Sequence, residues 1–527
     1  MQLEISNNEI DRAIHILFPK GADFCEERRK FIRSLDSIDV QACPGSGKTT
    51  ALILKLIILS SKLPLPNNQG ICVLTHTNAA VNEIKHRFGI MINDLINYPN
   101  FLGTFQTFID KFLAIPYLIN QYGKRPVSID NDQFSFEINK NQGIKGFRNA
   151  QYYLRQKKYL DLSSLRFSFE NFFISKSLND ERPFIGQNTP TYKAIRDHKL
   201  EVLKKGYLCF DDAYALASQY IKEFPTICSL ISKRFKFVFI DEMQDTDIHQ
   251  IKIIDSIFPN TETIIQRIGD SNQAIYTYDV RKDLVWKQQN VSFINGSKRL
   301  SLPIAKAIKN IGVNPQELEG NPDHEKILPT LLVFDDEDIS QVIPSFAQLI
   351  SENNLQNKVK NPIFKAIGWV GKKNDKNHTI VNYWPGFSNQ RKKNYVNHSS
   401  LEDYIDLLSG QKEAKYYMNS ILDGIVRFLR INNVIDINSR YFTKTTFQKY
   451  LEMEQPELFS ELKLQLIKWV SQYYSGDDAF DQIHDFLINR LAKILINDYL
   501  VDSIENKNFF ERGNLKDHSL DSNIAML

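Results

Sequence analysis

The sequence predicts an α/β fold in which a parallel sheet binds a nucleotide at the carboxyl ends of its strands. Residues 42–49 read Ala-Cys-Pro-Gly-Ser-Gly-Lys-Thr and stand between the apolar residues Ile38 and Val40 and a helix predicted over residues 50–59. This order of strand, glycine-containing loop and helix is typical of a phosphate-binding loop. Residues 237–242 read Phe-Val-Phe-Ile-Asp-Glu. Four apolar residues before two carboxylates indicate a buried parallel strand that ends at the ligand-binding edge of the sheet.

The loop at residues 42–49 contains the residue types that phosphate binding requires. Gly45 and Gly47 let successive backbone N–H groups turn toward phosphate oxygens. Lys48 is predicted to reach the β- and γ-phosphates, and the Thr49 hydroxyl is predicted to bind Mg²⁺. The first position of the usual pattern holds Ala42 instead of glycine. The alternative is a glycine turn with an incidental lysine. The predicted nucleotide-binding residues are Ala42, Pro44, Gly45, Ser46, Gly47, Lys48, Thr49 and Thr50.

The two carboxylates of the second segment complete the predicted site. Asp241 is predicted to hold Mg²⁺, directly or through water, and Glu242 is predicted to polarise the water that attacks the γ-phosphate. The alternative is a strand that ends in a solvated acidic turn, which does not account for the phosphate-binding loop upstream. We therefore expect ATP and Mg²⁺ as the ligands of this site.

Composition limits the class of protein. The 527 residues suffice for several domains, each with its own core. No apolar run reaches the length of a membrane span and the amino-terminus lacks a signal-peptide layout, so we expect a cytoplasmic protein with no membrane partner. The five cysteines include no C-x-x-C pair, which argues against zinc and disulfides. The net charge is only +3, so any path for DNA must be a local basic track.

Six segments resemble, in the same order along the chain, the motifs of UvrD/Rep/PcrA-type superfamily 1 helicases. The segments are 74–80 (motif Ia), 103–108 (motif Ib), 207–212 (the D-F-D-D segment), 241–246 (D-E-x-Q-D), 269–276 (motif III) and 298–301 (motif IV). Within that family, residues 206–276 are similar to the helicase-like GajB-type subunits of Gabija anti-phage systems. The resemblance implies a P-loop RecA-like core, DNA as the substrate, single-stranded or partly duplex, and a partner that is an OLD-family (GajA-like) nuclease.

The resemblance also implies a division of the chain into two RecA-like domains with helical insertions. Strands are expected at 38–41, 71–75, 101–104 and 263–268, then at 330–334 and 365–370, and helical periodicity fills about 400–515. The second RecA-like domain looks incomplete. The expected domains are 1–113 (1A, first part), 114–200 (1B-like insertion), 201–300 (1A, second part), 301–399 (2A-like, partial) and 400–527 (helical, 2B-like).

Further roles follow from the resemblance for side chains outside the phosphate loop. Gln273 is expected to contact the γ-phosphate or the attacking water, and its alternative is a turn glutamine. Arg299 is expected to be an arginine finger, and its alternative is a surface arginine. Together with Glu242, these are the predicted catalytic residues.

Residues of motifs Ia, Ib and III are expected to meet nucleic acid. Phe105 and Phe108 can also be core residues, and Tyr276 either stacks on a base or belongs to the core. The basic run 391–393, near Tyr383 and Trp384, is either a solvated face or a nucleic-acid contact. The predicted nucleic-acid contacts are His76, Thr77, Asn78, Thr104, Phe105 and Tyr276.

The chain departs from the family pattern in several places. The position of the adenine-reading glutamine holds Glu26-Glu27-Arg28, the aromatic residue of motif Ia is His76, and the aromatic–arginine pair after motif III is Tyr278-Asp279. Motifs V and VI, with the second arginine finger, are not found. Two functional classes therefore stay open. One is a DNA-dependent ATPase or helicase, and the alternative is a nucleotide-responsive assembly or sensor subunit without sustained helicase activity.

Overall fold

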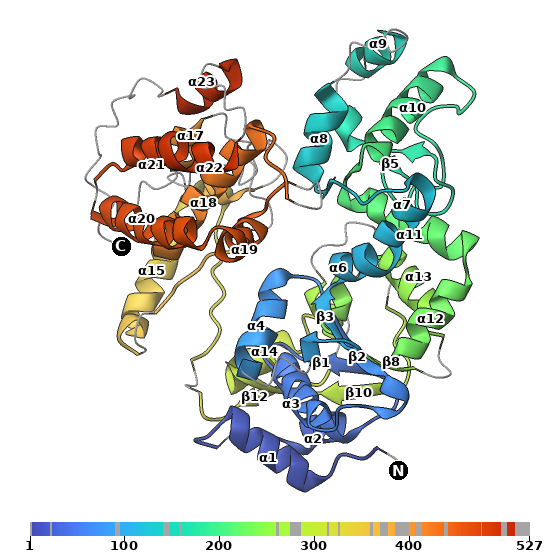
Figure 1. The fold of residues 1–527 in the computed structure, drawn as a ribbon. Coiled ribbons are helices and arrows are strands. Elements are labelled where there is room, and N and C mark those ends of the chain that lie inside the picture. The colour runs from blue at the N-terminus through green and yellow to red at the C-terminus, as the bar shows by residue number, and fades with distance from the viewer. Residues whose placement is uncertain are drawn as a thin grey trace.

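The computed structural model has a sheet-centred core, a helical extension on one side of it and a separate cluster of helices near the carboxyl end (Figure 1). The structure describes residues 3–21, 24–89, 95–140, 148–156, 161–259, 263–274, 286–312, 316–324, 327–358, 362–368, 378–384, 400–405, 414–436, 441–475, 477–496 and 503–511.

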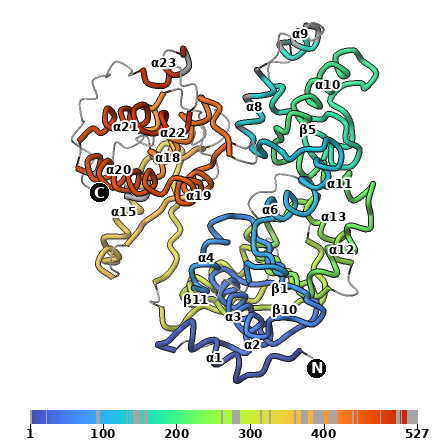
Figure 2. The backbone as a smooth tube through the Cα atoms, viewed as in Figure 1, coloured from blue at the N-terminus to red at the C-terminus, as the bar shows by residue number. Residues whose placement is uncertain are grey.

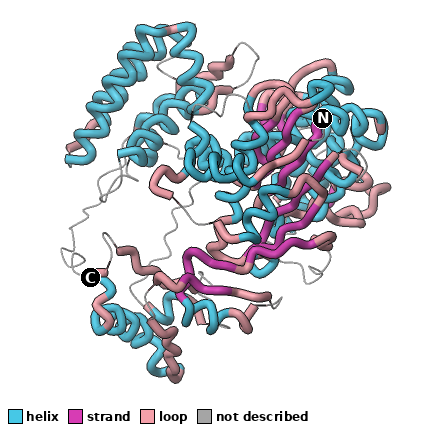
Figure 3. The backbone as a smooth tube through the Cα atoms, turned by 90° about the horizontal axis from the view of Figure 1, so that it is seen from below, coloured by secondary structure: helices cyan, strands magenta, loops and turns pink. Residues whose placement is uncertain are grey.

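The core is a six-stranded sheet in which every neighbouring pair of strands is parallel. Its strand order is β10-β1-β9-β8-β2-β3, and Figure 3 shows the strands side by side between helices. The predicted α/β fold class is confirmed. The strands expected at 38–41, 71–75, 101–104 and 263–268 are present to within one residue, and the strand expected before Asp241 is also formed. The strands are β1 (Ile38–Ala42), β2 (Gly70–Thr75), β3 (Phe101–Thr104), β8 (Phe235–Ile240), β9 (Ile264–Gly269) and β10 (Val291–Ile294).

Alternate residues of these strands enter two hydrophobic cores, one on each face of the sheet. Val73 and Phe239 pack on one face with α1, α2, α3 and α4, whereas Leu74 and Val238 pack on the other with helices that include α6, α11 and α13. Both faces are covered, which explains why the strands are continuous apolar runs. The helices are α1 (Asn7–Leu17), α2 (Glu26–Arg33), α3 (Lys48–Ser60), α4 (Asn78–Phe88), α6 (Phe105–Ile109), α11 (Phe210–Glu223), α12 (Thr226–Arg234) and α13 (Ile248–Ile257).

Helix α3, which follows the phosphate loop, is buried around its whole circumference from Ala51 to Ser60. Lys55, within this buried stretch, is fully buried and donates to the Phe31 carbonyl (2.8 Å), to the Gln266 side chain (2.7 Å) and to the Ser34 carbonyl. Burial lowers the pKa of Lys55 well below its ordinary value. The lysine thus ties α3 to the end of α2 and to β9, and it fixes the helix that begins at the phosphate loop.

The expected insertion at 114–200 is mostly helical and shares one hydrophobic core with the sheet. Leu118, Phe134 and Ile195 belong to the same buried cluster as Leu74 and Val238. The division into domains at residues 113 and 201 stays a prediction. Figure 2 shows this segment extending from the sheet. Its elements are α7 (Ile115–Tyr122), β4 (Ser128–Ile129), α8 (Asn131–Lys140), α9 (Arg148–Gln156), β5 (Arg166–Phe167), β6 (Ile174–Ser175), α10 (Pro190–Lys204) and β7 (Tyr207–Leu208).

The region after the sheet contains few strands, and the expected strand at 330–334 is not formed. Residues 330–334 and 365–368 have no regular structure, and residues 369–370 of the second expected strand lie outside the described part. A strand needs a neighbour for its backbone hydrogen bonds, and the described residues offer none here. The elements of this region are β11 (Gly296–Ser301), α14 (Leu302–Ile308), β12 (Glu319–Asn321), α15 (Val342–Glu352) and α16 (Ile380–Tyr383).

The described part of residues 400–511 is helical, as the periodicity predicts. Ile421, Ile425, Phe428 and Leu429 are all buried and surround the same core as Trp469. None of the helices in the described part of the chain combines the length and the apolar composition that a membrane crossing requires. The helices are α17 (Leu401–Ile405), α18 (Ala414–Ile431), α19 (Lys444–Glu454), α20 (Pro456–Ser475), α21 (Phe480–Phe486), α22 (Lys493–Leu495) and α23 (Ile504–Phe510).

Candidate nucleotide-binding site

Three successive carbonyls of the phosphate loop are held from outside the loop. The Pro44 carbonyl accepts from Ser297 Oγ (2.7 Å), the Gly45 carbonyl from the Lys298 N–H (2.9 Å), and the Ser46 carbonyl from Arg28 Nε (2.7 Å). The C=O and N–H of a trans peptide point in opposite directions. The N–H groups of Gly45 and Gly47 therefore point away from these partners, and the Ser46 N–H turns to the Cys43 carbonyl. With the unpaired first N–H groups of α3, they form a ready site for an anion.

Glycine is required at both of these loop positions. Gly45 and Gly47 have φ values of +71° and +75°, a left-handed conformation that side chains disfavour. A Cβ on Gly45 would also lie only 2.4 Å from Arg299 Cβ. This close approach brings β11, which contains Arg299, directly onto the phosphate loop.

The phosphate loop and the acidic strand meet at the carboxyl edge of the sheet. Thr49 Oγ1 donates to Asp241 Oδ2 (2.9 Å), and Lys48 Nζ pairs with Glu242 Oε2 (2.6 Å). Burial, and then the neighbouring Glu242 carboxylate, raise the pKa of Asp241 to about 6. A buried carboxylate beside a hydroxyl, next to an anion site, is the oxygen donor set that Mg²⁺ uses with phosphate and water as its other ligands. The residues therefore fit the predicted metal.

The backbone of Glu242 is left-handed, with φ of +56°, a strained conformation typical of functional sites. Gln244 holds its side chain, because Gln244 Nε2 donates to Glu242 Oε2 (2.6 Å). The other end of Gln244 accepts from the Asp270 N–H (3.0 Å). A Cβ on Gly269 would lie 2.5 Å from Gln244 Oε1, so this contact also requires glycine. The roles expected from the sequence did not include Gln244, although it lies inside the D-E-x-Q-D segment.

The two further predicted catalytic residues lie in different settings. Gln273 Nε2 donates to Asp270 Oδ2 (2.7 Å), so a contact between Gln273 and the γ-phosphate requires this bond to open. Arg299 is exposed, and its Cβ lies over Gly45. The structure thus brings Arg299 to the loop and holds Gln273 against a buried aspartate.

Glu27 and Arg28 stand where the family has its adenine-reading glutamine. Here Arg28 braces the phosphate loop, and Glu27 holds Asn295. Arg28 is buried and also donates to the Gly296 carbonyl (2.5 Å) and to Cys25 Sγ (2.8 Å). The Glu27 carboxylate accepts from the backbone N–H (2.8 Å) and the side chain (3.1 Å) of Asn295. These contacts connect α2, the loop and β11. The sequence shows only that glutamine is missing, because the partners are as many as 268 residues away.

The predicted nucleic-acid contacts do not all lie at the surface. His76 stacks on Phe105, with ring centroids 4.8 Å apart, and its Nε2 lies 2.9 Å from Thr246 Oγ1. Burial lowers the pKa of His76 to about 4. Phe105 is only 2% exposed, so the expectation that it contacts nucleic acid is corrected. Its ring belongs to the hydrophobic core, which is the alternative given for it above, and so does the ring of Phe108.

The other predicted contacts lie at helix starts or outside the described residues. Thr77 Oγ1 accepts from the Ala80 N–H (3.1 Å) and caps α4, with the exposed Asn78 next to it. Thr104 Oγ1 accepts from the Thr107 N–H (3.2 Å) and caps α6. Tyr276 and the basic run 391–393 lie outside the described residues.

Comparisons with known proteins cover the part of the chain that contains the phosphate loop and the acidic strand. Residues 26–281 match the UvrD/REP helicase N-terminal domain. The chain is 25% identical over 285 residues to the RecBCD enzyme subunit RecB of Buchnera aphidicola subsp. Schizaphis graminum, covering 51% of this chain and 21% of that protein. It is 25% identical over 362 residues to the Gabija protein GajB of Bacillus cereus, covering 58% of this chain and 48% of that protein.

A third relative is a probable DNA helicase II homolog of Mycoplasma genitalium, 23% identical over 361 residues, which cover 64% of this chain and 48% of that protein. The chain thus spans about half or less of the length of these three relatives. The resemblance that the motifs predict is confirmed.

Proposed function

We propose, from the match of residues 26–281 to the UvrD/REP helicase N-terminal domain, that this chain binds Mg-ATP at residues 42–50 and hydrolyses it in response to DNA. Two observations together carry the proposal. Three carbonyls of the phosphate loop are held by residues outside the loop, and Lys48 and Thr49 contact Glu242 and Asp241 respectively. This arrangement supplies an anion site, a cation for the phosphates and a carboxylate for water in one place.

ATP binding changes the partner of Lys48. The Lys48–Glu242 ion pair (2.6 Å) opens when Lys48 turns to the β- and γ-phosphates. Glu242 then keeps its bond from Gln244 and has an oxygen available to accept from water. Mg²⁺, held by Thr49 and Asp241, would neutralise charge on the phosphates. Arg299, beside Gly45, is proposed to reach the γ-phosphate, and Gln273 is proposed to do so after it releases Asp270.

DNA is proposed to run over the carboxyl edge of the sheet, past Thr77, Asn78 and Thr104. These residues begin helices, where backbone N–H groups and hydroxyls can meet phosphate oxygens. His76 contacts Thr246, which follows Glu242 in the D-E-x-Q-D segment. A shift of the DNA-facing loops can therefore change the position of Glu242. The likeness to the Gabija protein GajB supports a defence complex with an OLD-family nuclease as the setting.

The alternative is an assembly or sensor subunit that binds nucleotide without sustained strand separation. The observation that favours it is that residues 330–334 and 365–368 form no strand. A two-domain motor closes a second sheet over the nucleotide, whereas the sheet formed by the described residues after β10 has only two short strands, β11 and β12.

Calorimetry and turnover of two variants test the site. Lys48→Ala removes a charge-assisted contact of about 1.5–3 kcal/mol, so we expect ATP binding at least about tenfold weaker. Glu242→Gln keeps its shape and should bind ATP, with turnover reduced by about 10²–10⁴. Lys233→Ala, on the exposed face of α12, is the matched lysine control. Equal ATP affinity of Lys48→Ala and the unchanged chain would refute the site.

Turnover with and without single-stranded DNA separates the two functional classes. DNA stimulation together with strand displacement supports the helicase, either alone or with the nuclease present. ATP binding with unstimulated turnover in both settings supports the sensor. Stimulation should weaken as salt rises, because DNA phosphates exchange counterions for protein contacts.

A further inference from the structure

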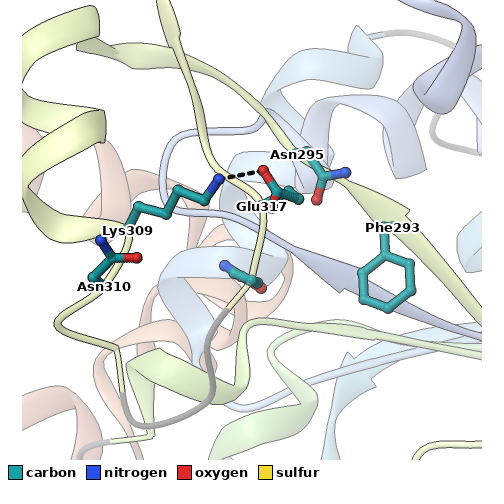
Figure 4. Close-up of a pocket in the computed structure, with 6 residues that line it drawn as sticks. Phe293, Asn295, Lys309, Asn310 and Glu317 are labelled. Carbon is teal, nitrogen blue, oxygen red and sulfur yellow. Dashed lines mark hydrogen bonds and ion pairs between the residues drawn. The ribbon is translucent and has the colours of Figure 1, made fainter.

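A pocket of about 450 Å³ lies beside the edge strand β10, outside the phosphate loop (Figure 4). Figure 4 shows the Phe293 ring on one side, Lys309 and Asn310 on the other, and Asn295 and Glu317 between them. Its described lining residues are Phe293, Asn295, Lys309, Asn310, Gln316 and Glu317.

The pocket opens on the sheet face opposite to α3. Ile294 enters the core shared with α3, and side chains of a strand alternate between faces, so Phe293 points the other way. Its strand neighbour Gln41 also points away from that core and bonds Gln316. Phosphates held at the start of α3 are therefore across the sheet from this pocket, which separates it from the base of an ATP bound there.

Phe293 offers a flat apolar surface to a ligand. The side chain is 50% exposed although it is a large aromatic residue in a strand. An exposed aromatic face at the edge of a pocket is a stacking platform for planar rings, and base–aromatic stacking contributes about 1–3 kcal/mol.

The polar side chains of the pocket offer a ligand one hydrogen-bond acceptor and one donor, and the described lining carries no net charge. The backbone N–H of Asn295 and one N–H of its side chain donate to Glu27. This orients the side-chain amide and leaves its oxygen as an acceptor. Gln316 uses its oxygen to accept from Gln41 (2.7 Å), so its NH₂ group remains as a donor among the described residues. Lys309 and Glu317 neutralise one another at 2.5 Å.

We propose that this pocket binds a nucleobase, stacked on Phe293 and hydrogen-bonded by the side-chain amides of Asn295 and Gln316. A nucleobase is a neutral planar ring with donors and acceptors side by side on its edge, and the pocket presents the complement of each feature. The inference goes beyond the proposed function, because the pocket uses none of the residues assigned to ATP turnover.

A base in this pocket contacts a hydrogen-bond network that ends at the proposed catalytic carboxylate. Gln316 bonds Gln41, whose Nε2 lies 3.5 Å from Asp270 Oδ1. Asp270 donates its N–H to Gln244, and Gln244 donates to Glu242. Occupancy of the pocket therefore acts on the position of Glu242 through this chain of hydrogen bonds, and it is expected to change ATP turnover.

Fluorescence of 2-aminopurine tests the pocket, with the free riboside and a single-stranded oligonucleotide containing one such base as probes. Stacking quenches the base, so we expect quenching that saturates with protein concentration. Phe293→Ala should weaken binding about fivefold or more, the lower end of the stacking range, and Phe293→Tyr should preserve it. Phe224→Ala, another exposed phenylalanine, is the matched control.

The two probes distinguish the source of the base. Binding of the riboside identifies a free nucleobase compound, and binding of the oligonucleotide alone identifies a base within a strand. The Lys48→Ala variant should bind the probes normally, which keeps this result independent of the ATP site. Equal binding by Phe293→Ala and the unchanged chain overturns the proposal, as do loss of binding in Lys48→Ala and absence of quenching by either probe.

Discussion

The strand β2 and residues 330–334 are both short apolar runs, yet β2 lies inside a sheet, whereas residues 330–334 form no strand and expose most of Leu331 and Val333. In β2, Val73 and Leu74 are at most 1% exposed, and the strand is hydrogen-bonded to β8 on one side and β3 on the other. In residues 330–334, Leu331 is 85% and Val333 87% exposed. The same kind of sequence is therefore buried only where neighbouring strands and helices exist to cover it.

The difference shows what makes an apolar run a strand. An isolated extended segment satisfies its backbone groups with water and loses its apolar contacts, whereas a strand inside a parallel sheet has hydrogen bonds on both edges and helices on both faces. Stability in this chain is accordingly expected to come from the sheet and its two cores, and little of it from residues 330–334.

The largest effect is expected from Leu74→Ala, the first of two matched leucine substitutions. Leu74→Ala deletes a fully buried side chain from the core shared by β2 and α6, and we expect the free energy of unfolding to fall by about 2–5 kcal/mol. Chemical denaturation followed by far-UV circular dichroism measures the change. A loss below about 1 kcal/mol would mean that this sheet face is loosely packed.

A partly buried acid next to the same core gives the next effect, with the opposite sign. Asp110 is partly buried and accepts from Gln106 Nε2 (2.8 Å), and burial raises the pKa of its carboxyl to about 7. The folded state thus binds this proton more tightly than the unfolded state. Stability from this group is present below the unfolded pKa of about 4 and is lost as pH rises toward 7.

Asp110→Asn should therefore stabilise the protein at pH 8 and not at pH 4. The shift corresponds to at most about 4 kcal/mol, and partial access of water reduces the gain. Asparagine keeps the oxygen that Gln106 donates to, so packing is preserved. Unfolding curves at pH 5, 6, 7 and 8 would show a gain that grows with pH. A gain independent of pH would indicate an effect on packing and not on ionisation.

The parts of the site that could be predicted from the sequence are those whose partners are close in the chain. The spacing from Gly45 to Thr49 specifies a phosphate loop by itself, and the run that ends in Asp241-Glu242 specifies a buried strand with acids at its end. Arg28 could not be predicted in the same way, because it acts on Ser46 and on Gly296, at separations of 18 and 268 residues.

Burial decided the remaining differences. The sequence pattern cannot tell whether an aromatic residue of a motif faces a ligand or the core, and Phe105 faces the core. Nor can an apolar run show whether it has neighbours, which is why the expected strand at 330–334 is wrong. Both errors concern tertiary contacts that involve residues far away in the chain.

The smallest effect expected is that of Leu331→Ala, the counterpart of Leu74→Ala. The two variants remove the same atoms, and only the surroundings differ. Since Leu331 is 85% exposed, the substitution should change the free energy of unfolding by no more than about 0.5 kcal/mol, in denaturation experiments run alongside Leu74→Ala. A cost of about 2 kcal/mol or more would show that Leu331 is covered in the folded protein. Both runs would then be buried, and β2 and residues 330–334 would differ only in which neighbouring elements cover them.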